Sequence, residues 1–445
     1  MKRCIGIFLA SILVLTAAAC SKSAPAPETT PSTVPAASTA GSPAKPVTLK
    51  LGVPNGNSLT PLVLVDNFKA KFPNITVVTD KTPWSDFKTK LKTQIAASNP
   101  PDVFIMDSGY NATLGAMGAA LDLSGLIGKD LNAEDFTASL FAAKAPDGKV
   151  YGIPQAINVL GVAYNKKLFD EAQIPYPKED WTWQDMMDIA EKLTKDTDND
   201  GQPDVYGLLV SQSITNGWLP FVLSTGGSPL DETKTKSMFG DPKTVEGLAK
   251  YEGAVYDLKV VPPQAWVTAN VGHNQAFYGG KAGMLFMLAS SAADINKNAP
   301  DLDWDVQMMP VGWDGNRHVI YVPNNWIIFS KSGADVQAAA WEWIKFYLSE
   351  ESQNLYAQTC PGGYPIRKSA LDIVAKTDTK PANKNAFITG VDKYGITLFE
   401  NSTYEQWKPE VDKVIKDLYL GNIKSADAAK QIDKTVQDIL DSEAQ

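Results

Sequence analysis

The sequence predicts an α/β fold, because strand patterns and helix patterns alternate along the chain from residue 47 onward. The run Val47–Val53 has an apolar residue at every second position, as a strand with one buried face does. The run Asp102–Asp107 is apolar throughout between its two acidic ends, which is typical of a parallel strand covered on both faces. Phe87, Leu91 and Ile95 recur between these runs at helical spacing, so the three segments together indicate a β-α-β unit.

Later segments predict further helices. Thr182 is a predicted N-cap, because Asp185 stands at the third helical position and can complete the cap. The positions expected to face the core are Met186, Ile189, Ala190 and Leu193 in this helix, Trp341, Ile344, Tyr347 and Leu348 in a second, Val411, Val414, Ile415 and Leu418 in a third, and Ile432, Val436, Ile439 and Leu440 in a fourth. The length of 445 residues predicts two or three domains.

The composition excludes several classes of function. The chain has 41 basic and 50 acidic residues, a formal net charge of −9, and no cluster of Lys and Arg that would neutralise phosphates. We therefore expect no nucleic-acid partner. With only two histidines and three cysteines, a His-rich zinc site and a disulfide framework are nearly excluded as well.

Residues 1–20 predict an export signal. Lys2 and Arg3 precede an apolar run over 5–19 that is too short to cross a bilayer of about 30 Å. The small residues before Cys20 resemble the lipobox of bacterial lipoproteins, although Ala17 stands where Leu is commonest. Cys20 would then be lipidated after cleavage. Ordinary cleavage that leaves Cys20 unmodified stays open.

Residues 21–46 are nearly all Ser, Thr, Ala and Pro. Such a segment buries too little apolar surface to offset the entropy of ordering it, so it is a predicted disordered tether. No later stretch has the ~18 consecutive apolar residues of a membrane helix. We expect the body to meet the membrane only through the lipid anchor, on the extracellular face of the cell membrane.

The motifs of common enzymes are absent from the sequence. It has no G-x-S-x-G and no H-E-x-x-H. The Gly279–Lys281 triplet is followed by Ala282 and lacks a glycine at Gln275, so it is not a phosphate-binding loop and ATP is not expected. We assign no catalytic residue and no required cofactor. A secreted glycan-cleaving enzyme remains the alternative, because a pair of catalytic carboxylates is defined by its separation in space.

The segment DTDNDGQPDVYG, residues 196–207, resembles the oxygen-ligand ladder of a calcium loop. Gly201 stands at the sharp turn of such a loop, but Gly207 stands where a bidentate Glu would be expected. The candidate ligands of a structural calcium ion are Asp196, Asp198, Asp200, Gln202 and Asp204. A plain polar turn between a helix and a strand stays open as the other interpretation.

Aromatic residues in polar, glycine-containing contexts favour a carbohydrate ligand, because flat rings stack on the apolar faces of sugars. Trp84, Trp218 and Trp313 stand in such contexts and are predicted loop residues. Trp341 and Trp343 lie in a helical pattern and are expected in the core.

Six features in a fixed order resemble one family. They are Cys20, NPPDVFIMD (99–107), YGIPQAINVLGVAYNKKLF (151–169), WTWQDM (181–186), AFYGGKAGMLF (276–286) and GGYPIRKSA (362–370). In this order they resemble the extracellular solute-binding proteins of ABC importers, of the maltose-binding-like, sugar-specific group. The resemblance extends from Val47 to the C-terminus.

The resemblance implies a two-lobe Venus-flytrap fold with a ligand cleft between the lobes. Lobe one would comprise 47–157 and 303–352, and lobe two 158–302 and 353–445. The implied protein is not an enzyme: it is a monomeric receptor that captures a sugar by hinge closure and delivers it to the transmembrane subunits of an ABC permease. The identity of the sugar and its charge stay open.

The resemblance also implies ligand contacts from Trp84, Asp107, Tyr110, Gly363 and Tyr364. Ligands of open α/β sheets bind beyond the carboxyl ends of strands, which favours the segments 55–58, 107–110 and 324–326. The full set of predicted ligand-binding residues is Trp84, Asp107, Tyr110, Trp218, Trp266, Trp313, Asn325, Gly363 and Tyr364.

Overall fold

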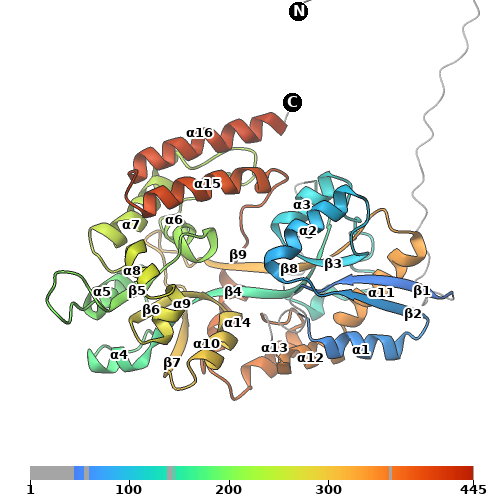
Figure 1. Ribbon diagram of the computed structural model, residues 1–445, viewed down its shortest axis with the longest axis horizontal. Coiled ribbons are helices and arrows are strands. Elements are labelled where there is room, and N and C mark those ends of the chain that lie inside the picture. The colour runs from blue at the N-terminus through green and yellow to red at the C-terminus, as the bar shows by residue number, and fades with distance from the viewer. Residues whose placement is uncertain (1–44, 55–59, 138–143, 146, 360–362, 444–445) are drawn as a thin grey trace, which may run out of the picture. The chain divides into compact units, whose positions relative to one another are not determined.

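A long strand, β4, organises the fold, because its two halves pair with different groups of strands (Figure 1). The computed structural model describes residues 45–54, 60–137, 144–145, 147–359 and 363–443. The predicted signal, Cys20, nearly all of the predicted tether and the segment 55–58 lie outside the described residues. The strands are β1 Val47–Gly52, β2 Ile75–Asp80, β3 Val103–Asp107, β4 Ile153–Asn165, β5 Tyr206–Leu209, β6 Ala282–Leu288, β7 Trp304–Met308, β8 Val319–Ile328 and β9 Gly395–Ile396.

The strands join in the order β2-β1-β3-β8-β4-β6-β5, and β7 pairs with β4 while β9 pairs with β8. Ile153–Val159 of β4 pairs antiparallel with β8, and Leu160–Asn165 pairs antiparallel with β6 and β7. The strands β1, β2 and β3 are parallel to one another, as β5 and β6 are. The predicted strands at Val47–Val53 and Asp102–Asp107 are confirmed as β1 and β3.

Helices cover both faces of the sheet. They are α1 Leu62–Lys71, α2 Trp84–Ala96, α3 Gly109–Ala116, α4 Lys166–Glu171, α5 Trp183–Leu193, α6 Leu219–Ser224, α7 Pro242–Tyr256, α8 Gln264–Ala269, α9 His273–Tyr278, α10 Ser291–Asn298, α11 Ala334–Tyr347, α12 Glu350–Thr359, α13 Lys368–Ala375, α14 Asn385–Tyr394, α15 Tyr404–Tyr419 and α16 Ser425–Glu443. Short turns of other helix types lie at Ala133–Asp135 (η2) and Ile214–Trp218 (η4).

Two apolar layers enclose the strands around β3 and β8. On one face Phe104 and Ile327 pack in a cluster with Phe87 of α2 and Leu114 of α3. On the other face Trp326 of β8 lies 5.4 Å, ring centre to ring centre, from the Trp343 ring of α11. Fully burying an apolar side chain of this size contributes roughly 1.5–3 kcal/mol, so these layers hold β3 and β8 in place.

The helix α5 begins as the sequence predicts. The Asp185 backbone N–H donates to the Thr182 hydroxyl over 3.1 Å, and the Thr182 backbone N–H donates to the Asp185 carboxylate over 2.8 Å. This reciprocal pair satisfies two backbone donors at the helix start. The helix then contacts β5 so closely that Gly207 faces the backbone of Ala190.

The C-terminal helices join separate parts of the chain (Figure 1). α15 and α16 pack on each other and on α7, and the first turn of α15 contacts α3. The ring of Tyr404 lies against Gly109, where an added Cβ would be 2.7 Å from the ring. The four helices predicted from apolar spacing are confirmed as α5, α11, α15 and α16.

The segment 324–326 is not a loop after a strand: it lies inside β8, paired with β3 on one side and β4 on the other. Trp304–Met308 pairs with the same half of β4 as β6 does, although the predicted boundary at 303 assigns it to lobe one. The described body forms one compact unit, so the division into two lobes stays a prediction.

None of the described helices combines the length and the apolar character that crossing a bilayer requires.

Candidate functional site

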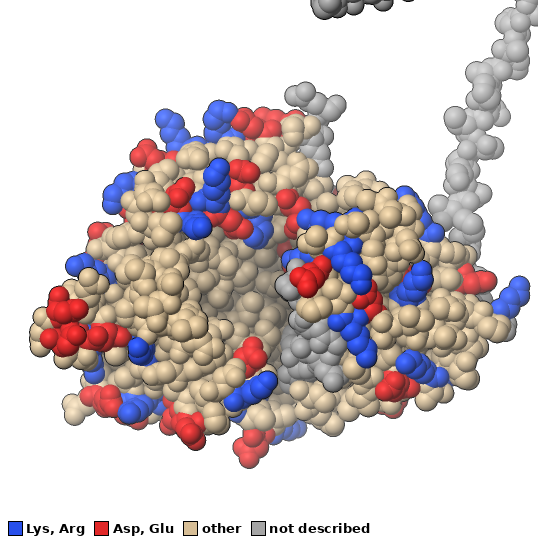
Figure 2. All heavy atoms as spheres, in the orientation of Figure 1, with Lys and Arg blue, Asp and Glu red and all other residues tan. Residues whose placement is uncertain are grey.

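One face of the body is hollowed between the region of α6 and the region of α2, over β4 and β8 (Figure 2). Trp84 is the first residue of α2, and its side chain lies outside the described residues.

Asp107 and Tyr110 lie together where β3 passes into α3. The Lys88 ammonium forms an ion pair with the Asp107 carboxylate. The ammonium groups of Lys88 and Lys92 lie 5.5 and 5.2 Å from the centre of the Tyr110 ring, within the range of cation–π attraction. Burial and a hydrogen bond with Glu405 raise the pKa of Tyr110 far above its ordinary value. Tyr110 is therefore a neutral, covered ring and not an open stacking surface.

Glu400 is the titratable group that sequence reasoning missed. The Ser108 hydroxyl donates to its carboxylate over 2.6 Å, and the Lys234 ammonium donates to its backbone carbonyl over 3.1 Å. The pKa of Glu400 is raised to about 8: burial raises it most, the nearby Asp107 and Glu405 carboxylates also raise it, and Ser108 and Lys234 lower it. Three segments far apart in sequence thus meet at Glu400.

Trp218 is a core residue and not a loop residue. It ends η4, has no exposed surface, and its ring lies 5.6 Å from that of Phe239. The prediction of a loop position for Trp218 is wrong, because the turn of η4 directs the ring inward. Trp266 instead lies on α8, half-buried, with its ring 4.9 Å from Tyr206.

Trp313 is a half-buried ring in the connection between β7 and β8. One side packs on Trp183 at 5.1 Å, and the Lys250 ammonium lies 4.1 Å from its centre. Trp218, Trp266 and Trp313 therefore pack on three different aromatic partners, and the structure does not assemble them into one aromatic wall.

Asn325 lies in β8 with no exposed surface, opposite Met106 of β3. A Cβ atom on Gly152 would lie 3.0 Å from the Asn325 Cβ and 2.9 Å from the Asn111 Oδ1, so the two amides flank this glycine. Within the described part of the chain, neither amide has a hydrogen-bond partner. A buried amide without a partner costs about 1–3 kcal/mol.

Gly363 and Tyr364 pair with β4. The Tyr364 and Ile157 backbones exchange hydrogen bonds of 2.8 and 3.0 Å. Gly363 has φ +138°, and a Cβ there would lie 2.8 Å from the Ile157 carbonyl oxygen, so only glycine fits this approach. The Tyr364 ring packs on Phe387 at 5.6 Å and is nearly buried.

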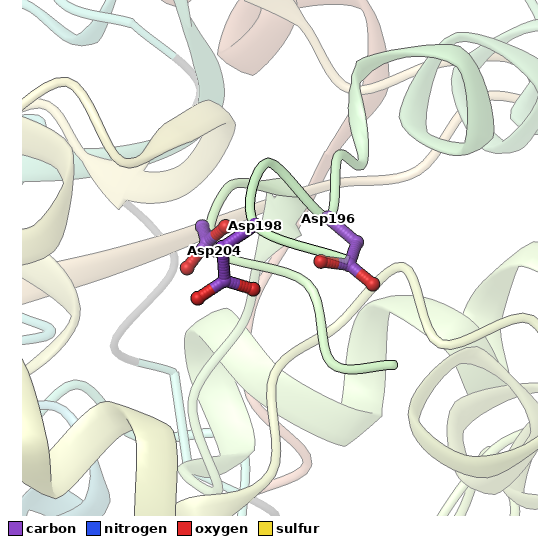
Figure 3. Close-up of side chains that lie close together, drawn as sticks. All are labelled: Asp196, Asp198 and Asp204. Atoms are coloured by element: carbon purple, nitrogen blue, oxygen red, sulfur yellow. The ribbon is translucent and has the colours of Figure 1, made fainter. Parts of the chain in front are cut away.

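The acidic loop brings three of its five predicted ligands together (Figure 3). One carboxylate oxygen from each of Asp196, Asp198 and Asp204 lies within 4.8 Å of the others. Hydrogen bonds from Thr197 lower the pKa of Asp204, so this carboxylate is ionised well below neutral pH. Asp200 is not in this group and accepts instead from the backbone N–H of Gln202 over 2.8 Å. The donor set fits a hard cation, which prefers oxygen ligands.

Residues 53–354 match the model of the bacterial extracellular solute-binding proteins. The chain belongs to this family, which confirms the resemblance noted in the sequence. Because the family consists of solute receptors, the chain is not an enzyme.

Solved structures have the same fold. An ABC substrate-binding protein of Listeria monocytogenes in complex with cycloalternan has a TM-score of 0.77 at 23% identity, over 88% of this chain and 98% of that one. The sugar-binding protein MalE of Xanthomonas citri has a TM-score of 0.74 at 19% identity, over 89% and 98%. The diacetylchitobiose binding protein DasA of Streptomyces coelicolor is 25% identical over 299 residues, which cover 65% of each chain. The expected α/β fold of periplasmic sugar-binding proteins is confirmed.

Proposed function

We propose that this protein is the sugar-capturing subunit of an ABC importer, and that its ligand is an oligosaccharide passed intact to a membrane permease. The family match over residues 53–354 is the observation that carries the proposal. The proteins similar to this chain include one named for diacetylchitobiose and one in complex with cycloalternan, both of them carbohydrates.

Capture would proceed by closure of the two predicted lobes about the strands that connect them. β4 and β8 are natural hinge elements, because each pairs with strands on both sides of the hollow. A ligand that touches both walls binds the closed form better, and it shifts the population by no more than that difference in affinity. The lipidated Cys20 and the tether over 21–46 would hold the receptor beside its permease.

The test of this function is a thermal-shift screen of the mature protein against diacetylchitobiose, maltotriose and glucuronate-containing oligosaccharides. We expect at least one sugar to raise the melting temperature by several degrees, because a ligand at 100 times its Kd adds about 2.7 kcal/mol to the free energy of unfolding. Chromatography of the same samples should return intact sugar. Cleaved sugar would support a glycan-cleaving enzyme, and a panel without any shift would contradict the proposal.

The acidic loop is proposed as a structural calcium site. We expect Ca²⁺ to raise the melting temperature relative to EGTA by a few degrees, because three ionised carboxylates within 4.8 Å repel one another without a cation. In Asp198→Asn the difference between Ca²⁺ and EGTA should shrink strongly. The matched control is Asp188→Asn on α5, outside this group, which should keep it. Equal melting temperatures of the parent in Ca²⁺ and EGTA would leave the segment a plain polar turn.

A further inference from the structure

The first turn of α15 and the residues just before it are held against α2 and α3 (Figure 1). The Thr113 hydroxyl of α3 donates to the Ser402 carbonyl over 3.0 Å. The Lys92 ammonium of α2 lies 3.4 Å from the Glu405 carboxylate. We call the contacts of residues 400–405 with α2, α3 and the turn between β3 and α3 the Glu400 latch. By the predicted boundaries these contacts join lobe one to lobe two.

The carboxyl group of Glu400 lies inside this latch. The residue keeps some exposed surface, but its carboxylate accepts a hydrogen bond of 2.6 Å from Ser108, which is only 4% exposed. Two further hydrogen bonds join this segment to the turn 231–236. The Lys234 ammonium donates to the Glu400 backbone carbonyl over 3.1 Å, and the Asn401 side-chain amide donates to the Lys234 carbonyl over 3.0 Å.

The latch has little capacity to hold another negative charge. The titratable groups of the surrounding elements are Asp107 of β3, Lys88 and Lys92 of α2, Tyr110 of α3, Lys234 of the turn 231–236, Tyr321 of β8, and Tyr404 and Glu405 of α15. Lys88 is paired with Asp107, and Lys92 is paired with Glu405. Among the described residues the Asp107 Oδ1 is buried with no hydrogen-bond partner. An ionised Glu400 would add a third carboxylate where one carboxylate oxygen already lacks a donor.

Opening of the latch would release a proton. The surroundings favour the protonated form of Glu400, in agreement with its pKa of about 8. When the latch opens, water reaches the carboxyl group and its pKa returns toward the ordinary 4.5. Between these two values the closed latch holds a proton that the open latch has lost. The equilibrium constant for opening should therefore rise about tenfold per pH unit and level off above about pH 8.

We propose that the Glu400 latch is a proton-controlled contact: protonated Glu400 keeps it closed, and loss of that proton promotes its release by local unfolding of residues 400–405 while the rest of the fold stays intact. The proposal goes beyond sugar capture, because the opening depends on pH and needs no ligand. Since the latch joins the two predicted lobes, alkaline surroundings would loosen their connection in the free receptor.

Hydrogen exchange of the mature protein, measured by mass spectrometry on peptides that cover 398–407, tests this proposal. The backbone N–H groups of Tyr404, Gln406 and Trp407 donate to the carbonyls of Asn401 and Thr403, so they exchange when this turn opens. Chemical exchange of an open amide itself speeds up about tenfold per pH unit in this range. Because the opening equilibrium should rise by a similar factor, we expect exchange to speed up about a hundredfold between pH 6 and pH 7.

Two matched variants complete the test. Glu400→Gln stays neutral at every pH, so exchange of its 398–407 peptides should speed up only about tenfold between pH 6 and pH 7. Glu410→Gln, an exposed position on α15, should keep the steeper dependence of the parent. Peptides of β4 measure global unfolding and should exchange more slowly than the latch at each pH.

Three results would overturn the proposal. They are a tenfold acceleration in the parent, a hundredfold acceleration in Glu400→Gln, and exchange of the latch peptides no faster than that of β4. None of these measurements includes a sugar, so a thermal-shift screen without a hit would contradict the sugar receptor and leave the outcome for the latch as measured.

Discussion

Gly207→Ala should destabilise the protein by about 4 kcal/mol or more, a large part of the roughly 5–15 kcal/mol by which proteins are ordinarily stable. A Cβ at this position in β5 would lie 1.9 Å from the Ala190 carbonyl oxygen and 2.4 Å from the Ala190 Cα. Both atoms belong to the backbone of α5, so no side chain can rotate away. The helix and the strand would have to separate, which would open the core around Ala190 and Leu208, both now without exposed surface. Urea unfolding measures the loss.

Gly125→Ala is the matched control for this substitution. Gly125 lies in an exposed turn, and a Cβ there would meet no atom within 4 Å. We expect its free energy of unfolding to stay within about 0.5 kcal/mol of the parent. Equal unfolding midpoints for the two variants would mean that α5 and β5 do not approach as closely as described.

Glu400 should make the free energy of unfolding fall as the pH rises from about 4.5 to about 8. Burial raises the folded-state pKa of Glu400 from its ordinary 4.5 to about 8, so folding takes up a proton between these values. The stabilisation from the protonated group is complete below about 4.5 and is lost as the pH approaches 8. Glu400→Gln keeps the neutral form at every pH. This variant should therefore have a flatter pH dependence and exceed the parent in stability at pH 8.

Urea midpoints at pH 5, 6.5 and 8 check this prediction. Glu410→Gln, an exposed position on α15, should leave the slope of stability against pH as it is in the parent. An unchanged slope in Glu400→Gln would show that the carboxyl group is ionised in the folded protein at neutral pH. The groups that face Glu400 are Ser108, Asp107, Lys234 and Glu405, and all four stay in place in Glu400→Gln.

The elements of the fold are largely predictable because each depends on local pattern. The start of α5 is set by two residues three positions apart, Thr182 and Asp185, and the structure has the predicted cap. The inward faces of α11, α15 and α16 follow from apolar spacing alone. β1 and β3 are equally predictable from the sequence: β1 from alternating apolar residues, and β3 from a continuous apolar run.

The candidate site is less predictable, because contacts between distant residues determine it. Asn216 and Gly217 beside Trp218 have the composition of a loop, yet the ring is buried against Phe239. Asn324 and Asn325 resemble turn residues, but β8 has a partner strand on each side there. Glu400 gains its unusual proton affinity from burial and from the Asp107 carboxylate, which lies some three hundred positions earlier in the chain. No local motif carries that information.

The continuity of β4 restricts which insertions and chimaeras this protein can accept. Its residues up to Val159 pair with β8, and those from Leu160 onward pair with β6 and β7, with no spacer between. Successive side chains of a strand point to opposite faces, so one residue inserted at this junction would turn every later side chain of β4 over. Chimaeras that exchange one half for that of a relative must therefore preserve the parity of this strand, whereas an insertion of two residues would keep inside and outside as they are.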